Sequence, residues 1–193
     1  GEHIMDGNPP RPTLLSLPAM ASAAGATRTL RVMTGIVIAP LYHPVTLAKM
    51  VSSVDLVSGG RLDFGIGISG QRGTKIEFDA VGVNPHTRGR RTDEMLPVMT
   101  RLWTEEHVTY ESDFLRLTDA SIGVRPRQTN IPIWIGSRSE AGLRRTGRLG
   151  DGWLPTQLTP EEVATGIARI NEYAAEAGRE IPQDHFGLQI SSY

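Results

Sequence analysis

The 193-residue sequence contains no cysteine, which excludes disulfide bonds, thiolate metal sites and cysteine nucleophiles. Long hydrophobic runs are also missing, since no apolar stretch approaches the ~20 residues that cross a bilayer. The formal net charge is −1, with no run of like charges to attract nucleic acid or an anionic membrane. We therefore expect binding to neither nucleic acid nor membrane, and the lack of cysteine agrees with a cytoplasmic location.

The sequence also lacks the motifs of several enzyme classes. It contains no G-x-S-x-G, no P-loop, no H-E-x-x-H and no paired-carboxylate spacing, which argues against hydrolase, kinase and glycosidase chemistry. The histidines do not pair at metal-ligand spacing, so we expect no metal site. They are His3, His43, His86, His107 and His185, of which the last three are expected on the surface or in turns.

The composition, with 39% apolar and 21% charged residues, is typical of a globular protein, and the length suits a single domain over residues 1–193. Apolar runs predict buried strands at residues 30–39, 61–68, 131–135, 153–155 and 186–192. Periodic apolar positions predict helices at residues 12–25, 44–57, 88–104, 140–149 and 160–177. A small hairpin is expected at residues 108–117.

Buried strands that alternate with helices indicate parallel β/α units. An open doubly wound sheet and a closed barrel both fit this pattern, which does not choose between them. In both architectures ligands bind beyond the carboxyl ends of the strands. The residues that follow each strand are therefore the candidates for chemistry.

A glycine-rich segment follows the predicted strand at 61–68. Residues 65–70 match the dinucleotide fingerprint G-x-G-x-x-G, but no helix is expected within the motif and no acidic residue follows about 20 positions later. A turn without a ligand is another interpretation. We favour a third, in which the missing side chains let a flat ring approach the backbone.

Small polar residues follow the predicted strand at 131–135. Gly136, Ser137, Arg138 and Ser139 precede a helix, where backbone N–H groups, hydroxyl groups and the helix dipole favour an anion. Helix capping by Ser137 or Ser139 is the simpler alternative. We favour phosphate binding, with Arg138 adding positive charge.

Two histidines lie where strands are expected to end. His3 follows Glu2 in a short strand-like segment, a position suited to acid–base chemistry. His43, between Tyr42 and Pro44, could face a site at the strand ends or orient a loop.

Six sequence blocks occur in an order typical of one family. They are YHPVTLAK at 42–49, VDLVSGGRLDFGIG at 54–67, EFDAVGV at 77–83, RGRRTDE at 88–94 with LW at 102–103, PIWIG at 132–136 and LGDGWLP at 149–155. Together they resemble the luciferase-like monooxygenase family, particularly the branch that uses the deazaflavin coenzyme F420. The resemblance covers essentially the whole chain.

The resemblance implies a (β/α)₈ TIM barrel. Complete family members are longer, so we expect this chain to lack the first strand and helix and the last strand and helix of the barrel. The strand at 61–68 would be the fourth of the barrel, and Glu2-His3 would end the second.

The resemblance also implies a place for the cofactor. The ring would lie against a bulge of the third strand near Gly35-Ile36, often with a non-proline cis peptide bond. The ring edge would meet the loop after the fourth strand, at Gly67, Ile68 and Ser69. The phosphate tail would meet the residues after two later strands, namely Gly136, Ser137, Arg138, Ser139 and Thr156.

The catalytic residues implied by the resemblance are Glu2 and His3, which match an acidic residue and a histidine of sugar-phosphate dehydrogenase relatives. Those relatives carry a glutamate where this chain has Gly70, so a sugar-phosphate substrate is not expected. Glu77 is expected to support the loop rather than to protonate a substrate.

The implied function is hydride transfer between F420 and a small organic substrate, with His3 as the proton donor or acceptor. Two alternatives are an FMN-dependent monooxygenase on the same fold and a non-catalytic flavin-binding relative. The resemblance further implies a homodimer.

Overall fold

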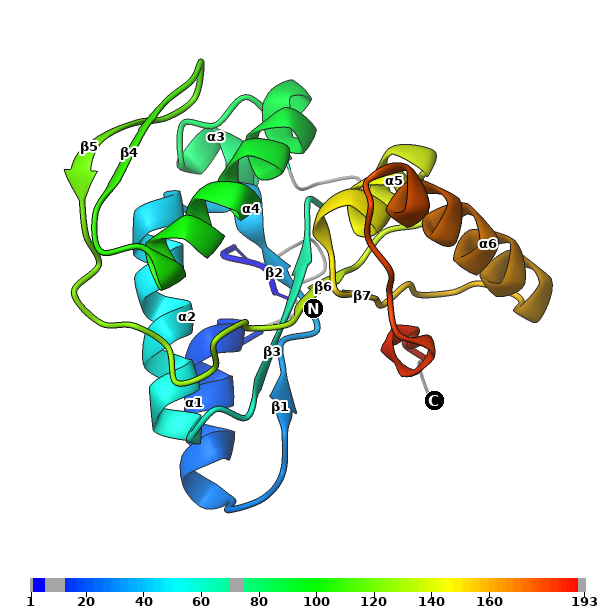
Figure 1. Cartoon of the computed structure of the whole chain (residues 1–193), viewed down its shortest axis with the longest axis horizontal. Coiled ribbons are helices and arrows are strands. Elements are labelled where there is room, and N and C mark those ends of the chain that lie inside the picture. Colours follow the sequence, from blue (N-terminus) through cyan, green and yellow to red (C-terminus); the bar gives the residue numbers. More distant parts are fainter. Residues whose placement is uncertain (1, 6–12, 70–74, 191–193) are drawn as a thin grey trace.

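A parallel sheet of five strands forms the centre of the computed structural model, which describes residues 2–5, 13–69 and 75–190 (Figure 1). The strand order is β1-β3-β6-β7, with β2 also paired to β3. The strands are β1 (Val32–Met33), β2 (Val37–Ile38), β3 (Leu62–Gly67), β6 (Ile133–Ile135) and β7 (Gly152–Trp153). All of these pairs are parallel, as the alternation of strands and helices predicts.

Helices follow the strands, and all of the α-helices except α3 lie in regions predicted to be helical. The α-helices are α1 (Ser16–Ala26), α2 (Pro44–Ser58), α3 (Lys75–Ala80), α4 (Arg88–Thr104), α5 (Glu140–Leu149) and α6 (Pro160–Glu176). Short 3₁₀ turns are η1 (Ala39–Leu41), η2 (Pro85–Thr87) and η3 (Gln183–His185). Among the described residues, no helix is long and apolar enough to cross a membrane.

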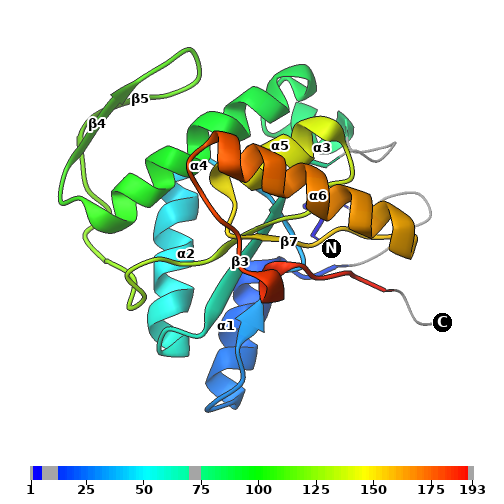
Figure 2. The ribbon, with the colours of Figure 1, turned by 45° about the vertical axis from the view of Figure 1, so that its right-hand side comes forward.

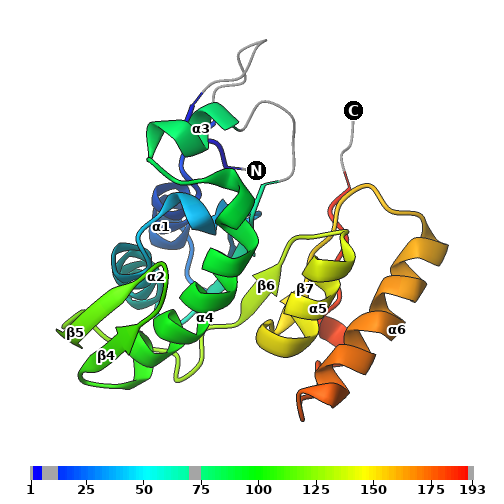
Figure 3. The ribbon, with the colours of Figure 1, turned by 90° about the horizontal axis from the view of Figure 1, so that it is seen from above.

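The helices form an arc that runs from α1 and α2 through α4 to α5 and α6 (Figure 3). Ile135 and Trp153 are partners in the register of β6 and β7, so their side chains point to the same face of the sheet. Ile135 packs in the core cluster with residues of α2 and α4, and Trp153 packs with Leu143 of α5 and Ile170 of α6. The helices therefore cover one face of the described sheet, as in a barrel and unlike a doubly wound sheet.

The ends of two helices follow directly from local chemistry. Pro44 is the first residue of α2, and Gly59 ends it with φ of 70°, a conformation that glycine adopts at little cost. Thr159 and Glu162 form the predicted capping box at the start of α6. Helices α5 and α6 then pack against each other (Figure 2).

The predicted strand at 30–39 is interrupted. Val32 pairs with Leu62, an offset of 30 positions, whereas Val37 pairs with Ile66, an offset of 29. One extra residue therefore lies between β1 and β2, which is the definition of a β-bulge. A continuous strand was the wrong prediction here, and the bulge that the family resemblance implies is present.

Smaller departures concern the ends of elements. Helix α1 begins at Ser16 rather than at residue 12, and the second hairpin strand is β5 (Arg116–Ala120), paired with β4 (Val108–Glu111). The region 186–190 makes only isolated bridges, from Phe186 to Trp153 and from Gln189 to Thr156, and residues 191 and 192 lie outside the described part. Glu2 and His3 are not in a strand, although the N–H of Glu2 donates to the carbonyl of Ile36 at 3.3 Å.

Candidate functional site

The bulge between β1 and β2 forms a surface that we call the floor, made by Gly35, Ile36, Gly67 and Gly136. The Gly35–Ile36 peptide bond is cis, as the resemblance implies. The Ile36 side chain lies across the ends of β3 and β6, because a Cβ atom built on Gly67 or Gly136 would stand 2.0 Å and 3.0 Å from its Cδ1 atom. Residues predicted to contact the ring and the tail therefore meet at the carboxyl ends of three strands.

Gly65 allows the bulge to approach β3 closely. A Cβ atom at this position would stand 1.9 Å from the carbonyl oxygen of Thr34, so only glycine fits. The Thr34 hydroxyl donates to the carbonyl of Gly65 and accepts from its N–H, each at 2.8 Å. The glycines of this strand thus shape the floor, and β3 continues through Gly67 where a dinucleotide fingerprint would require a helix.

Ile68 and Ser69 extend the floor beyond β3, and both are half-buried. Ser69 adopts φ of 56°, and its carbonyl accepts a hydrogen bond from Nε of Arg88 at 3.0 Å. Because Arg88 is the first residue of α4, that helix holds the loop in place. Gly70, the position that departs from the sugar-phosphate relatives, lies outside the described residues.

The segment 136–139 leads into α5 as predicted. Ser139 is the N-cap, and its Oγ accepts from the N–H of Gly142 at 3.2 Å. The Oγ atom of Ser137 lies 3.2 Å from the Oγ atom of Ser139. The Ser137 carbonyl accepts a hydrogen bond from Nε1 of Trp153 at 2.8 Å. Capping is therefore confirmed for Ser139, while the first turn of a helix still presents backbone N–H groups to an anion.

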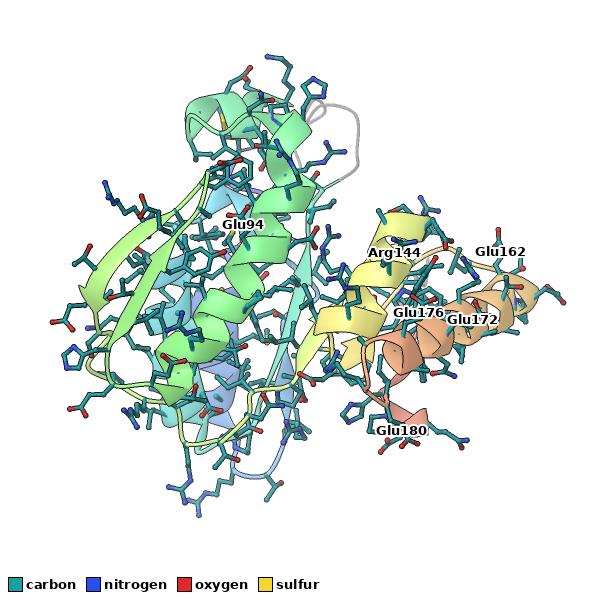
Figure 4. The ribbon with its side chains drawn as sticks, turned by 45° about the horizontal axis from the view of Figure 1, so that its top comes forward. Glu94, Arg144, Glu162, Glu172, Glu176 and Glu180 are labelled. Carbon is teal, nitrogen blue, oxygen red and sulfur yellow. The ribbon has the colours of Figure 1, made fainter. Side chains whose placement is uncertain are left out.

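Arg138 is exposed and lines an open pocket of about 320 Å³ between α5 and α6. The other lining residues are Leu143, Trp153, Leu158, Glu161, Glu162, Thr165 and Gly166. Figure 4 shows Glu162 at the outer end of α6.

The N-terminus of α6 is already occupied by its own capping box of Thr159 and Glu162, so α5 is the better end for an anion. Hydrogen bonds from its own backbone N–H and from Thr159 lower the pKa of Glu161, which keeps a further negative charge at the start of α6.

Thr156 lies three residues beyond the end of β7. Its backbone pairs with Gln189 in an isolated parallel bridge, and it is half-buried. The described contacts do not join Thr156 to the segment 136–139. Its role at the phosphate tail stays a prediction.

Glu2 and His3 are neighbours in the sequence, but their side chains contact different partners. The Glu2 carboxylate is buried and accepts hydrogen bonds from the Tyr42 hydroxyl and from the N–H of Ser16, both at 2.7 Å. Burial, together with Glu2, raises the pKa of Tyr42 above its usual range, so the hydroxyl remains a donor. Glu2 thus ties the start of α1 to Tyr42, and a catalytic role for it stays a prediction.

The carboxylate that contacts His3 belongs to Glu77. The distance from Nδ1 of His3 to Oε2 of Glu77 is 3.0 Å, and the side chains of His3 and Glu77 are 33% and 3% exposed. Glu77 also accepts from the N–H of Ile4 at 2.7 Å, so it holds the segment after His3, while its expected role in supporting the loop after β3 stays a prediction. Sequence reasoning missed the pairing because 74 residues separate the two side chains and no local pattern links them.

His43 caps a helix. His43 precedes α2, and its Nδ1 accepts from the N–H of Val45 at 3.4 Å, which supports the loop-orienting interpretation. Within the described ranges, no three His, Cys, Asp or Glu side chains gather in an arrangement that could hold a metal ion.

The arrangement therefore combines three chemical features. The floor is apolar, because Gly67 and Gly136 make room for the Ile36 side chain, which covers the ends of β3 and β6 with an aliphatic surface. The start of α5, with Arg138, can take an anion beside the floor. His3 supplies a part-exposed imidazole, and the backbone N–H of the preceding Glu2 bonds to Ile36 of the bulge.

Comparison with known proteins matches residues 3–192 to the family described as luciferase-like monooxygenase. A curated relative, the 4-hydroxyprotoasukamycin monooxygenase of Streptomyces nodosus subsp. asukaensis, is 33% identical over 181 residues. Those residues make up 89% of this chain and 48% of the relative.

Solved structures share the fold. The monooxygenase RslO1 from Streptomyces bottropensis has a TM-score of 0.79 and 28% identity, over 90% of this chain and 53% of that one. An F420-dependent secondary alcohol dehydrogenase in complex with an F420-acetone adduct has a TM-score of 0.79 over 92% of this chain and 54% of that one, and at 22% identity this likeness concerns the fold alone. The chain spans about half the length of the proteins it matches.

Proposed function

Because this chain belongs to the luciferase-like monooxygenase family, we propose that the protein transfers a hydride between F420 and a small organic substrate. The observation that carries the proposal is His3, a part-exposed imidazole held by a buried carboxylate, which follows the residue whose N–H bonds to Ile36 of the floor. F420, when bound, would supply the atom that gives or takes the hydride. The (β/α)₈ barrel and the homodimer that the resemblance implies are parts of the same proposal.

The floor supports the binding of a planar ring. Ile36 offers an apolar side chain that lies flat over Gly67 and Gly136, so a ring could pack against it. Ile68 and Ser69 would meet the ring edge, in a loop that Arg88 holds.

The start of α5 supports the binding of the phosphate tail. The first-turn N–H groups, the hydroxyl groups of Ser137 and Ser139 and the guanidinium group of Arg138 lie within one short segment after β6. Phosphate oxygens accept hydrogen bonds from all three kinds of donor.

His3 would move the proton that accompanies the hydride. When an alcohol carbon loses a hydride, its hydroxyl must also lose a proton, and the reverse reaction must regain one. Nδ1 of His3 is engaged by Glu77, so Nε2 is the ring nitrogen that can exchange that proton with the substrate oxygen. The floor and the start of α5 would hold the cofactor in place for this exchange.

A titration tests the choice of cofactor. We expect F420 fluorescence to be quenched on binding to the purified protein with a dissociation constant in the micromolar range or below, whereas FMN in a parallel titration should bind more weakly. Tight FMN binding without F420 binding would contradict the F420 proposal.

An FMN-dependent monooxygenase is the second candidate, and a specific observation favours it. Of the three relatives described above, the two with the higher identities, 33% and 28%, are both monooxygenases. The floor contacts a ring through Ile36 and backbone, so it does not by itself discriminate a flavin from a deazaflavin. The same titration separates the two candidates, and binding of either cofactor without turnover by the complete protein would indicate a non-catalytic relative.

Arg138→Ala should weaken cofactor binding by about 1–3 kcal/mol, which is roughly 5-fold to 150-fold in the dissociation constant, because one charge-assisted contact to phosphate is lost. Fluorescence titration measures the change. Arg148→Ala is the matched control, since Arg148 is an exposed arginine in the last turn of α5, the helix that Arg138 precedes. An equal response of the two variants would count against a phosphate contact by Arg138.

A further inference from the structure

Glu77 joins His3 both through the imidazole ring and through the backbone that follows it. Its Oε1 accepts from the N–H of Ile4 at 2.7 Å and from the N–H of Met5 at 3.4 Å, while its Oε2 lies 3.0 Å from Nδ1 of His3. The carboxylate is 2% exposed on helix α3, beside the buried Phe78. One buried side chain thus sets the course of the chain after His3 and the orientation of its ring.

The donors around Glu77 determine where the hydrogen on His3 lies. A backbone N–H can only donate, so Oε1 must accept. A carboxylate has no hydrogen to give, so Nδ1 must be the donor in its contact with Oε2. A neutral imidazole carries one N–H group, and Nε2 is then left with a lone pair that can accept a proton.

We propose that Glu77 is the positioning residue for His3, which it holds in the Nδ1–H tautomer so that Nε2 exchanges the proton with the substrate. This rests on the proposed function, in which His3 carries the proton. Glu2 is not available for the task, because its oxygens accept from Tyr42 and Ser16. The sequence neighbour of His3 is therefore not its functional partner.

The burial of Glu77 suits this role. Water has little access to the carboxylate, so the contact with Nδ1 meets little competition and its geometry is fixed. The negative charge also stabilises the ring after Nε2 has taken up a proton, as a carboxylate does for an imidazolium elsewhere. His3 itself keeps a 33% exposed side chain, which gives a substrate access to the ring.

Glu77→Gln gives a sharp test because glutamine has the same shape and one acceptor oxygen. The N–H groups of Ile4 and Met5 require that oxygen at the Oε1 position. The amide NH₂ group then occupies the Oε2 position and donates to Nδ1 of His3. The hydrogen on the ring must move to Nε2, so we expect the tautomer to reverse.

The experiment is two-bond ¹H–¹⁵N NMR on the full chain with ¹⁵N-labelled histidine, at about pH 8, where an ordinary histidine is neutral. The His3 signals are assigned by their loss in His3→Asn. We expect Nδ1–H in the natural protein and Nε2–H in Glu77→Gln. Asp79→Asn is the matched control, since it removes a 54% exposed carboxylate from the same helix and should leave the tautomer unchanged.

Two results would overturn the proposal. One is a natural protein in which Nε2 of His3 carries a hydrogen, whether or not Nδ1 also carries one. This result does not depend on the folding of any variant. The other is a folded Glu77→Gln protein that keeps the Nδ1–H tautomer. The measurement needs no cofactor, so failure to bind F420 would contradict the proposed function and leave the tautomer result standing as a separate outcome.

Discussion

Replacing Gly65 with alanine should destabilise the protein by about 3 kcal/mol, and it should weaken cofactor binding as well. The new Cβ atom would stand 1.9 Å from the carbonyl oxygen of Thr34, and real Cβ contacts essentially never fall below 3.0 Å. The Thr34 carbonyl cannot move away by itself, because Thr34 is held to β3 by three hydrogen bonds. Its N–H donates to Asp63, and its hydroxyl bonds to both the carbonyl and the N–H of Gly65. Relief must come from moving the bulge, which carries Ile36. Urea unfolding and F420 titration measure the two effects.

Gly25→Ala is the control for Gly65→Ala. Gly25 lies in α1 with no atom within 4 Å of the added carbon, so the change should raise the free energy of unfolding by about 0.5–1 kcal/mol. An ordinary surface substitution changes the free energy of unfolding by less than about 0.5 kcal/mol. If Gly65→Ala lowered the free energy of unfolding by no more than this, β1 and β3 would separate more easily than their hydrogen bonds suggest.

Asp55→Asn is expected to lower the free energy of unfolding by about 2–3 kcal/mol. Asp55 is fully buried in α2, and its Oδ2 accepts from the N–H groups of Arg127 and Gln128 at 2.6 Å and 3.0 Å. Its Oδ1 accepts from Nε2 of Gln128 at 2.7 Å, and that nitrogen also donates to the carbonyl of Leu62 at 2.8 Å. Either orientation of the asparagine amide therefore brings an NH₂ group against another donor.

The Asp55 side chain holds the loop that leads into β6 against the beginning of β3, so the loss should appear as lower cooperative stability of the sheet. Thermal or urea unfolding of Asp55→Asn measures it. Asp113→Asn, at an exposed position in the hairpin turn, should change stability by less than about 0.5 kcal/mol. Equal stability of the two variants would contradict the role assigned to Asp55.

Elements with strong local signals were predictable from the sequence. Helix α4 matches the expected range 88–104 at both ends, and Thr159, Pro160 and Glu162 begin α6 as predicted. The break between β1 and β2 could not be read from local pattern, because Val32, Ile36, Val37 and Ile38 look like one apolar run. Its cause lies on another strand, where Gly65 admits the backbone of Thr34.

The residues of the candidate site also differ in how far the sequence predicts them. Gly136, Ser137, Arg138 and Ser139 are contiguous, so their position at the start of α5 followed from a strand and a helix in sequence. The partner of His3 was different, because its identity depends on how α3 packs beside residues 3–5. A carboxylate directly before a buried aromatic gives no signal of a partner 74 positions away.

The extra residue in the bulge also determines which face of the sheet the side chains of β1 and β2 point to. Val32 and Val37 are five positions apart, and an uninterrupted strand would send their side chains to opposite faces. Both nevertheless pack in the core beneath the helices, because the alternation slips by one position between β1 and β2. The number of residues between β1 and β2 is therefore the constraint on this segment, more than their identity. Gaining or losing one residue would turn the side chains of one of the two strands to the opposite face of the sheet.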